Sequence, residues 1–223
     1  MKKLTFVVLM LGLVMVLAPA RANAQARLTQ PELQELTAEL GSVLRFRQLG
    51  DVAPIGKGRF DVGVHYAAID DRSNESPRVV GRIGISDRVD IGVWGGFDHR
   101  GNYGLAGGDV KIALMTQSPS RPVSIAIRPS VTSSIAADQA WVGNASIDIS
   151  ASRTFGAWSP YVGVGTSGSI GMERSKDVVL DYATANTSFA YAGISYRWRS
   201  LGLSAEVDSA ERRSYAFRVS TRF

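Results

Sequence analysis

From residue 59 onward, apolar and polar side chains alternate along the chain with a period of two. This alternation is the pattern of β-strands whose two faces meet different surroundings. Turn residues divide the region into ten segments. The predicted strands are 59–69, 79–86, 89–97, 105–115, 122–134, 141–150, 160–170, 188–199, 201–208 and 214–223.

An amphipathic helix is predicted before the strands, over residues 29–46, because leucines recur there at intervals of three and four residues. Thr29 and Pro31 provide a suitable cap and first turn. The stretch that follows is rich in glycine and proline and ends the helical period. We therefore expect residues 25–57 to form a helix and a linker, and residues 58–223 to form the β-domain.

The connections between predicted strands alternate in length. Asp87 and Arg88 join the second strand to the third, and Ser200 joins the eighth to the ninth, whereas residues 171–187 are predicted as a long loop. An even number of antiparallel strands, with tight turns at one end and longer loops at the other, is typical of bacterial outer-membrane barrels. The predicted fold is all-β: a ten-stranded antiparallel transmembrane β-barrel with an N-terminal periplasmic helix.

The two faces of the predicted strands differ sharply in charge. The more apolar face of each strand carries no charged residue, as contact with hydrocarbon requires. The opposite face carries six acidic and six basic residues, namely Asp61, Arg82, Asp90, Asp109, Lys111, Arg128, Asp148, Arg197, Glu206, Asp208, Arg218 and Arg222. Buried charges are tolerated when they are paired, so we expect this charge network to fill a narrow lumen, with Arg218 and Arg222 beside Glu206 and Asp208.

Aromatic residues gather near both ends of the predicted strands. Phe60, Phe155, Trp158, Trp198 and Phe223 fall near the turn ends, and Phe97, Tyr103, Trp141, Tyr191 and Tyr215 fall near the loop ends. Two such belts are typical of membrane interfaces. A soluble sandwich or a lipocalin-like binding barrel also alternates apolar and polar residues, but it has no reason to collect aromatics at strand ends.

One residue conflicts with a regular ladder of strands. Pro129 lies in the middle of the predicted strand 122–134 and has no N–H to donate to a neighbouring strand. A closed barrel has no free edge on which to place it, so we expect a bulge or a break at this position.

The N-terminus has the layout of a secretory signal peptide. Lys2 and Lys3 precede an apolar run, and alanines at every second position follow it. We expect residues 1–24 to be removed and the protein to reach the outer membrane. Loss of the basic residues in this segment lowers the formal net charge from +5 to +2, which argues against a nucleic-acid partner.

Few residues are available for metal or redox chemistry. The chain has no cysteine and only two histidines, so we expect neither a disulfide nor a metal site, and no cofactor. The charged run at 173–177 is interpreted as a solvated loop tip. Arg174 and Lys176 in this run are weak candidates for contact with lipopolysaccharide phosphates.

The signal-like start, the alternating strands, the aromatic belts and the terminal "FRVSTRF" together resemble the small bacterial outer-membrane β-barrel proteins, a group that includes OmpA-type and OmpW-type barrels. The resemblance covers residues 58–223. It implies membrane lipid and lipopolysaccharide as surroundings. In that group an ending such as Tyr215, Phe217, Val219 and Phe223 looks like the signal that the barrel-assembly machinery reads. The helix at 29–46 departs from the simplest members, and it is predicted either to plug the barrel or to offer a surface to a periplasmic partner.

Two enzymatic alternatives were weighed against a structural or narrow passive transport role. Omptin-type proteases are ten-stranded barrels with an Asp pair and an Asp-His pair, and the chain offers Asp70, Asp71, Asp98 and His99 in predicted loops. A lipid A deacylase would need a Ser-His-Glu site that faces lipid, for which Glu206 is available, but His65 has lumenal parity. We therefore expect no catalytic residue and no enzymatic activity.

Overall fold

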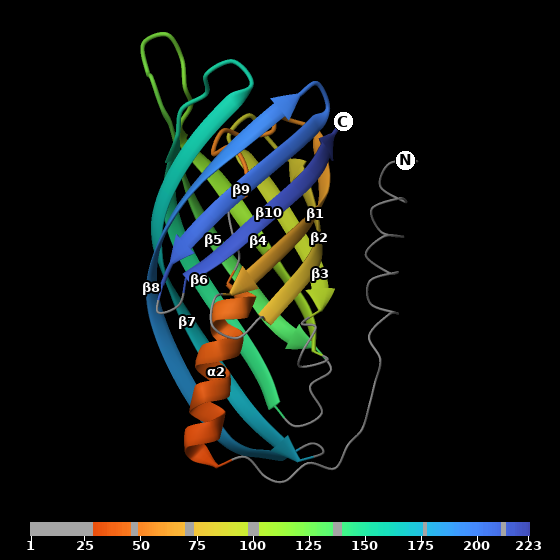
Figure 1. The fold of residues 1–223 in the computed structure, drawn as a ribbon, viewed down its shortest axis with the longest axis vertical. Coiled ribbons are helices and arrows are strands. Elements are labelled where there is room, and N and C mark those ends of the chain that lie inside the picture. The colour runs from red at the N-terminus through yellow and green to blue at the C-terminus, as the bar shows by residue number, and fades with distance from the viewer. Residues whose placement is uncertain are drawn as a thin grey trace.

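The computed structural model describes residues 29–45, 49–69, 74–97, 103–135, 140–175, 178–210 and 213–223. Its elements are α2 (Gln30–Leu44), β1 (Phe60–Ile69), β2 (Asn74–Gly84), β3 (Val89–Phe97), β4 (Gly104–Met115), β5 (Ser124–Ile135), β6 (Ala140–Ser152), β7 (Trp158–Ser175), β8 (Val178–Trp198), β9 (Leu201–Ser209) and β10 (Arg213–Arg222). The strands pair in chain order and β10 pairs with β1, which closes the barrel (Figure 1). The prediction of a ten-stranded antiparallel barrel is confirmed.

Side chains along each strand point alternately outward and into the barrel. In β1, Asp61 and His65 are buried, whereas Val64 between them is 58% exposed. Outward residues are equally exposed elsewhere around the barrel: Val162 of β7 and Phe217 of β10 are each 57% exposed. A soluble protein would bury such residues, so the outer face is matched to an apolar surrounding.

The hairpin of β7 and β8 is longer than the sequence predicts, and residues 171–187 are not a loop. Gly171 is paired with Ala183, and Ser167 with Thr187, in one continuous ladder. The outward residues of this part of β8 are Tyr182, Thr184, Asn186 and Ser188, so the apolar alternation that marks a lipid-facing strand is missing. β8 pairs with β9 only from Ala190 onward, and the hairpin therefore extends beyond the neighbouring strands.

The lengths of the connections do not distinguish the two ends of the barrel. We call the end with Phe60 and Phe223 the turn end, and the opposite end, where β1 finishes, the loop end. At the turn end, residues 116–123 connect β4 to β5. At the loop end, only residues 176 and 177 separate β7 from β8, so the turn-end connection is the longer of the two. The predicted contrast between short turns and long loops is thus wrong, and the longer β7–β8 hairpin takes the place of the expected loop.

Pro129 produces no bulge, but the pairing of β5 with β4 is interrupted beside it, so the second of the two expected outcomes occurs. β5 runs unbroken through it, and Pro129 faces Ile147 of β6 in regular register. On the β4 side the paired positions pass from Asp109–Ser130 to Ile112–Ile127 without a shift, so the missing N–H interrupts the ladder locally. The register shift in this pair of strands occurs instead between Ala113 and Met115.

The aromatic belts are only partly where the sequence predicts them. At the turn end, Phe155, Trp158, Trp198 and Phe223 are all more than half exposed. At the loop end, Phe97 and Tyr215 are exposed, but Tyr191 is buried and Tyr103 packs against buried core residues. Tyr191 lies opposite Asp208 on the inward face of a strand that continues far beyond it, so it is not at a strand end.

The helix forms nearly as predicted, from Gln30 to Leu44, with Thr29 before it and Pro31 in its first turn. Its buried face includes Leu33, Leu40 and Leu44. Among the described residues, no helix has the length and apolar character needed to cross a membrane.

Candidate functional site: an occupied barrel lumen

Residues 29–45 and 49–58, which precede β1, extend from the loop end of the barrel through its inside to the turn end. At the loop end, the Gln30 side-chain amide donates to the Tyr182 carbonyl at 3.2 Å, beside the long β7–β8 hairpin. At the turn end, the Gly58 amide donates to the Gly84 carbonyl at 2.8 Å, just before β1 begins. Figure 1 shows α2 at the end of the barrel opposite the C-terminus. We call residues 49–58 the lumen segment.

Helix α2 lies close against the inner face of β7. A Cβ atom on Gly171 would overlap the hydroxyl group of Thr37, and one on Gly41 would overlap that of Ser169. Glycine at these two positions permits the approach of helix and strand backbones. The helix also packs against β6 and β8, and Leu33 is buried against Ala183 of β8.

The last turn of α2 enters an apolar pocket within the barrel. Leu40, Val43 and Leu44 form one buried cluster with four inward residues from different strands. These are Val80 of β2, Trp94 of β3, Leu105 of β4 and Val142 of β6. Burial of a leucine or valine side chain stabilises by about 1.5–3 kcal/mol, so this cluster is the principal apolar anchor of the helix.

Two arginines anchor the C-terminus of the helix. Arg78 of β2 donates to the Val43 carbonyl and stacks over the ring of Trp94 at 4.4 Å. Arg45, directly after the helix, donates to Asp208 of β9 at 2.6 Å, and both side chains are 2% exposed. A cation at the unpaired carbonyls of a helix C-terminus is favourable, because these carbonyls carry partial negative charge.

The lumen segment then contacts β9 and β10 through its backbone. The Leu49 amide donates to Glu206 at 3.2 Å, and the Leu49 carbonyl accepts from Arg218 at 3.0 Å. Val52 is fully buried and shares a cluster with Phe189 of β8 and with Ala126 of β5, the strand opposite β10 in the ten-strand order. A segment that touches strands on opposite sides of a closed barrel lies within its lumen.

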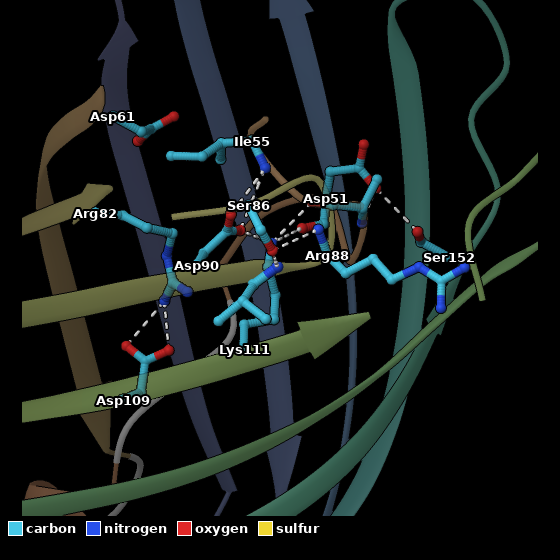
Figure 2. Close-up of polar contacts among 12 residues, drawn as sticks. Asp51, Ile55, Asp61, Arg82, Ser86, Arg88, Asp90, Asp109, Lys111 and Ser152 are labelled. Atoms are coloured by element: carbon cyan, nitrogen blue, oxygen red, sulfur yellow. Dashed lines mark hydrogen bonds and ion pairs between the residues drawn. The ribbon is translucent and has the colours of Figure 1, made fainter. Parts of the chain in front are cut away.

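Nearer the turn end, two charged residues of the strands and Asp51 of the segment itself hold the lumen segment in place (Figure 2). Lys111 of β4 forms an ion pair with Asp90 of β3 at 3.0 Å and donates to the Ala53 carbonyl at 2.8 Å. Asp90 accepts the Ile55 amide at 3.2 Å. Asp51 of the segment accepts the Ser152 hydroxyl of β6 at 2.9 Å. Strand charges thus replace the backbone partners that an extended segment lacks.

Two further ion pairs join strands of the wall to each other, one across β3 and one between the adjacent strands β5 and β6. Arg82 of β2 donates to both carboxylate oxygens of Asp109, at 2.7 and 2.9 Å. Arg128 of β5 donates to Asp148 of β6 at 2.6 Å, with both side chains 1% exposed. Tyr191 of β8 also donates a hydrogen bond to Asp148, at 2.8 Å. These pairs are internal to the wall of the barrel.

Asp61 receives three arginines at the turn end. Arg218 donates to one carboxylate oxygen, and Arg197 and Arg222 each approach the other at 3.4 Å. Arg197 is the most exposed of the three, with a third of its side chain accessible. The turn-end mouth of the lumen therefore carries an excess of positive charge.

All twelve charges of the predicted network lie on the inner face, but their partners differ in part from expectation. Arg218 and Arg222 were expected beside Glu206 and Asp208, whereas both bind Asp61. Glu206 and Asp208 instead hold Leu49 and Arg45. The sequence could not show this exchange, because strand parity predicts which residues share a face and not what lies between them.

Sequence reasoning missed three buried charged residues: Arg45 after helix α2, and Arg78 and Glu173 on the inner face of the barrel. Glu173 was interpreted as part of a solvated loop tip, but it is 3% exposed and paired opposite Asp181 within the β7–β8 ladder. Arg78 immediately precedes the strand predicted to begin at residue 79, and β2 begins earlier, at Asn74. Extending the inward parity of that strand by one residue would have found it.

The structure does not test the protease alternative. Asp70, Asp71, Asp98 and His99 lie outside the described residues, as do residues 1–24. His65 is 2% exposed on the inner face of β1, away from the lipid-facing surface. Across the described parts of the chain, no group of three or more His, Asp or Glu side chains could hold a metal ion. Tyr215, Phe217, Val219 and Phe223 lie exposed along the outer face of the barrel's last strand.

A closed barrel with an apolar outer face and a charged, occupied interior defines a transmembrane β-barrel. No family model and no curated protein matches the chain. Solved structures of similar fold include the KdgM porin, with 9% identity over 73% of this chain and 99% of the other, at a TM-score of 0.42. The N-terminal barrel of Pseudomonas aeruginosa OprF is 11% identical over 75% of this chain and 99% of its own length, with a TM-score of 0.37. Ail of Yersinia pestis is 9% identical over 75% of this chain and 99% of its own length, with a TM-score of 0.35. At these values the likeness identifies no family.

Proposed function

We propose that the protein is a non-enzymatic outer-membrane barrel whose lumen is closed by its own residues 29–58, and that its role in the envelope is structural. The observation that carries the proposal is the set of contacts of the lumen segment. Between Leu49 and Ile55, its backbone and side chains bind charged or polar residues of β3, β4, β6, β9 and β10. A path for solutes would have to break several of these buried contacts.

The membrane placement rests on the outer face and on the N-terminal pattern. A signal peptide at residues 1–24 would export the chain, and membrane lipid and lipopolysaccharide would surround the apolar belt. A cheap check of the barrel is a gel shift between unheated and boiled samples in detergent. A barrel of this kind resists detergent until it is heated, and a soluble sandwich does not.

Narrow passive transport is the competing role, and the turn end contains the one feature in its favour. A cavity of about 590 Å³ opens there between the 116–123 and 153–157 turns, lined by polar residues such as Gln117 and Arg153. Ala53 of the lumen segment forms part of its wall. Because the lumen segment lines the cavity, it stands between the cavity and the rest of the lumen in this proposal, and the structural role is favoured.

Conductance in a planar bilayer distinguishes the two roles. The full-length protein should show small or no current steps. The double variant Arg45→Ala, Lys111→Ala removes two anchors of the inserted chain and should show larger, frequent openings. Arg59→Ala, an exposed residue beyond the segment, is the control and should behave like the parent protein. Large stable steps from the parent protein would contradict a closed lumen.

In the orientation that we propose, the turn end, where β1 begins and β10 ends, lies in the periplasm and the loop end lies outside. In this orientation α2 occupies the outer mouth, because it lies at the loop end. An epitope inserted before Thr29 should then bind antibody on intact cells. Binding only after permeabilisation would reverse the orientation, and would make residues 29–46 available to the periplasmic partner that the sequence suggests.

The C-terminal residues are proposed to have a second role during assembly. Phe223 is 64% exposed at the turn end, so its removal costs the folded barrel little buried surface. Deletion of Phe223 should nevertheless reduce membrane levels strongly, if the barrel-assembly machinery reads Tyr215, Phe217, Val219 and Phe223. Phe155→Ala, which removes an equally exposed aromatic at the same end, is the matched control. Normal levels of the truncated protein would refute the signal.

A further inference from the structure

An aromatic patch lies on the outer face at the turn end, where β6–β7 and β8–β9 connect. Phe155 and Trp158 are bridged through their backbones, with the Phe155 amide donating to the Trp158 carbonyl at 2.7 Å. The ring of Trp158 lies 4.6 Å from that of Tyr196 on the paired strand β8. Trp198, two residues further along the same face, is 58% exposed. Aromatic rings of this kind favour the headgroup region of a bilayer.

Two exposed arginines lie over the rings of this patch. The Arg153 guanidinium is 4.7 Å from the centre of the Phe155 ring, and the Arg199 guanidinium is 5.4 Å from that of Trp198. We call these two arginines with Phe155, Trp158, Tyr196 and Trp198 the aromatic–arginine patch. Stacking on a ring orients a guanidinium while leaving its N–H groups available to a ligand.

The backbone at Arg199 supports a specific role for this side chain. Arg199 has a φ of +54°, a left-handed conformation that costs energy for any residue with a Cβ atom and that glycine adopts freely. The two-residue connection of β8 to β9 thus presents a long cationic side chain where glycine would fit better.

The charge of the patch is uncompensated. Residues 151–160 and 194–200 contain no aspartate or glutamate. Arg197 points inward to Asp61, and among the described residues no carboxylate pairs with Arg153 or Arg199. Guanidinium groups bind phosphate oxygens through two parallel hydrogen bonds, and arginines at a membrane surface favour anionic lipid. If the rings lie at the level of the lipid headgroups, the guanidinium groups beside them lie at the level of the lipid phosphates.

We infer that the aromatic–arginine patch binds the phosphate of an anionic phospholipid, of the phosphatidylglycerol class, in the leaflet at the turn end. The inference rests on the proposed membrane insertion. We choose phospholipid over lipopolysaccharide as the ligand because the turn end faces the periplasm in the proposed orientation, and the patch then meets the periplasmic leaflet of the membrane. The two guanidinium groups hold the phosphate, and the rings pack against the glycerol and upper acyl region.

Tryptophan fluorescence tests the site directly, because Trp158 and Trp198 lie within it. The full-length protein is reconstituted in phosphatidylcholine vesicles that contain a minority of brominated phosphatidylglycerol, and separately a minority of brominated phosphatidylcholine. Bromine quenches tryptophan at contact. The parent protein should prefer the anionic lipid, by about fivefold for each arginine that contacts it at low salt. The preference should weaken as salt is added.

The double variant Arg153→Gln, Arg199→Gln should lose this preference while retaining the heat-dependent gel shift. The matched control is Arg88→Gln, Arg121→Gln, which removes two exposed turn-end arginines from connections without aromatic residues. This control should keep the preference.

Equal quenching by the two lipids in the parent protein would overturn the site, as would an unchanged preference in the Arg153 and Arg199 variant. Stronger competition by lipid A than by phosphatidylglycerol would overturn the choice of phospholipid. Loss of the gel shift in the parent protein would instead mean that the proposed membrane barrel itself fails.

Discussion

The buried charges of this barrel belong to two groups with different partners. Arg128–Asp148 and Arg82–Asp109 join one strand of the wall to another. Arg45–Asp208, by contrast, joins the wall to the inserted chain, and Lys111 and Asp90 also bind backbone groups of the lumen segment. The first group holds the wall together whether or not the lumen is occupied. The second group holds the occupant, so closure of the lumen is a separable property of the fold.

This difference shows how a barrel can carry twelve inward charges at little cost. Burying an ion is expensive unless its partner and its remaining hydrogen bonds are supplied. In the wall another strand supplies the partner, and Tyr191 of β8 supplies a further hydrogen bond to Asp148. Around the lumen segment, the charges satisfy backbone groups that have no partner in a ladder, such as the amides of Leu49 and Ile55. The inserted chain and the second group of charges therefore stabilise each other.

Breaking a wall pair should have the largest effect on the barrel. Arg128→Ala leaves Asp148 buried without its cation and should lower the free energy of unfolding by about 3–5 kcal/mol, measured by denaturant unfolding in detergent. Ser130→Ala, which removes a neutral hydrogen bond on the same strand, should cost about 1 kcal/mol. Equal losses of unfolding free energy in the two variants would show that the ion pair stabilises the barrel no more than a neutral hydrogen bond does.

Breaking an anchor of the occupant should affect the lumen and spare the wall. Arg45→Ala removes a buried ion pair at the end of α2, and the docking of residues 29–58 should weaken by about 3 kcal/mol. Hydrogen exchange should accelerate in α2 and in the lumen segment, with β5 and β6 unchanged. Uniform acceleration throughout the strands would show that the two groups of charges are not separable.

A steric change at the helix contact should have an intermediate effect. Gly171→Ala introduces a Cβ atom that overlaps the Thr37 side chain, and should destabilise docking of the helix by about 1–3 kcal/mol. Thr37→Ala in the same chain removes the overlapping hydroxyl and should restore part of the loss. Gly81→Ala is a suitable control, because its Cβ would meet only Val93 at 3.9 Å. Failure of the second substitution to compensate would place the helix elsewhere.

The smallest effect is expected at the exposed start of the helix. The Thr29 amide and hydroxyl donate to Glu32 at 2.7 and 2.8 Å, and these bonds lower the pKa of the Glu32 carboxyl. A lowered folded-state pKa means that this contribution is present above the usual pKa of 4.5 and is lost as the pH falls through the folded value. Exchange of the first-turn amides should therefore rise in acid, and Glu32→Gln should remove that pH dependence. An unchanged acid response in Glu32→Gln would assign the effect to another group.

Much of the barrel could be predicted from the chain because lipid-facing strands impose a strict alternation. That alternation revealed the strands, their number and the inward set of charges, including Asp61 and Asp148. It failed where its physical cause was absent. The far part of the β7–β8 hairpin has Thr184, Asn186 and Ser188 on its outer face, so its strands have no apolar side and were taken for a loop. Tyr191 was misplaced for the same reason, since its distance from the strand end depended on that error.

By itself, the sequence determined the period, the faces and the helix, because these depend on neighbours one to four residues apart. Only the tertiary structure decided where the helix lies and which charges meet. The Arg45–Asp208 pair, the Leu49 amide on Glu206 and the Gly171–Thr37 approach join residues more than a hundred positions apart. Parity predicted an interior full of charge. Closure of the barrel around residues 29–58 decided that much of this charge is directed at the protein's own chain.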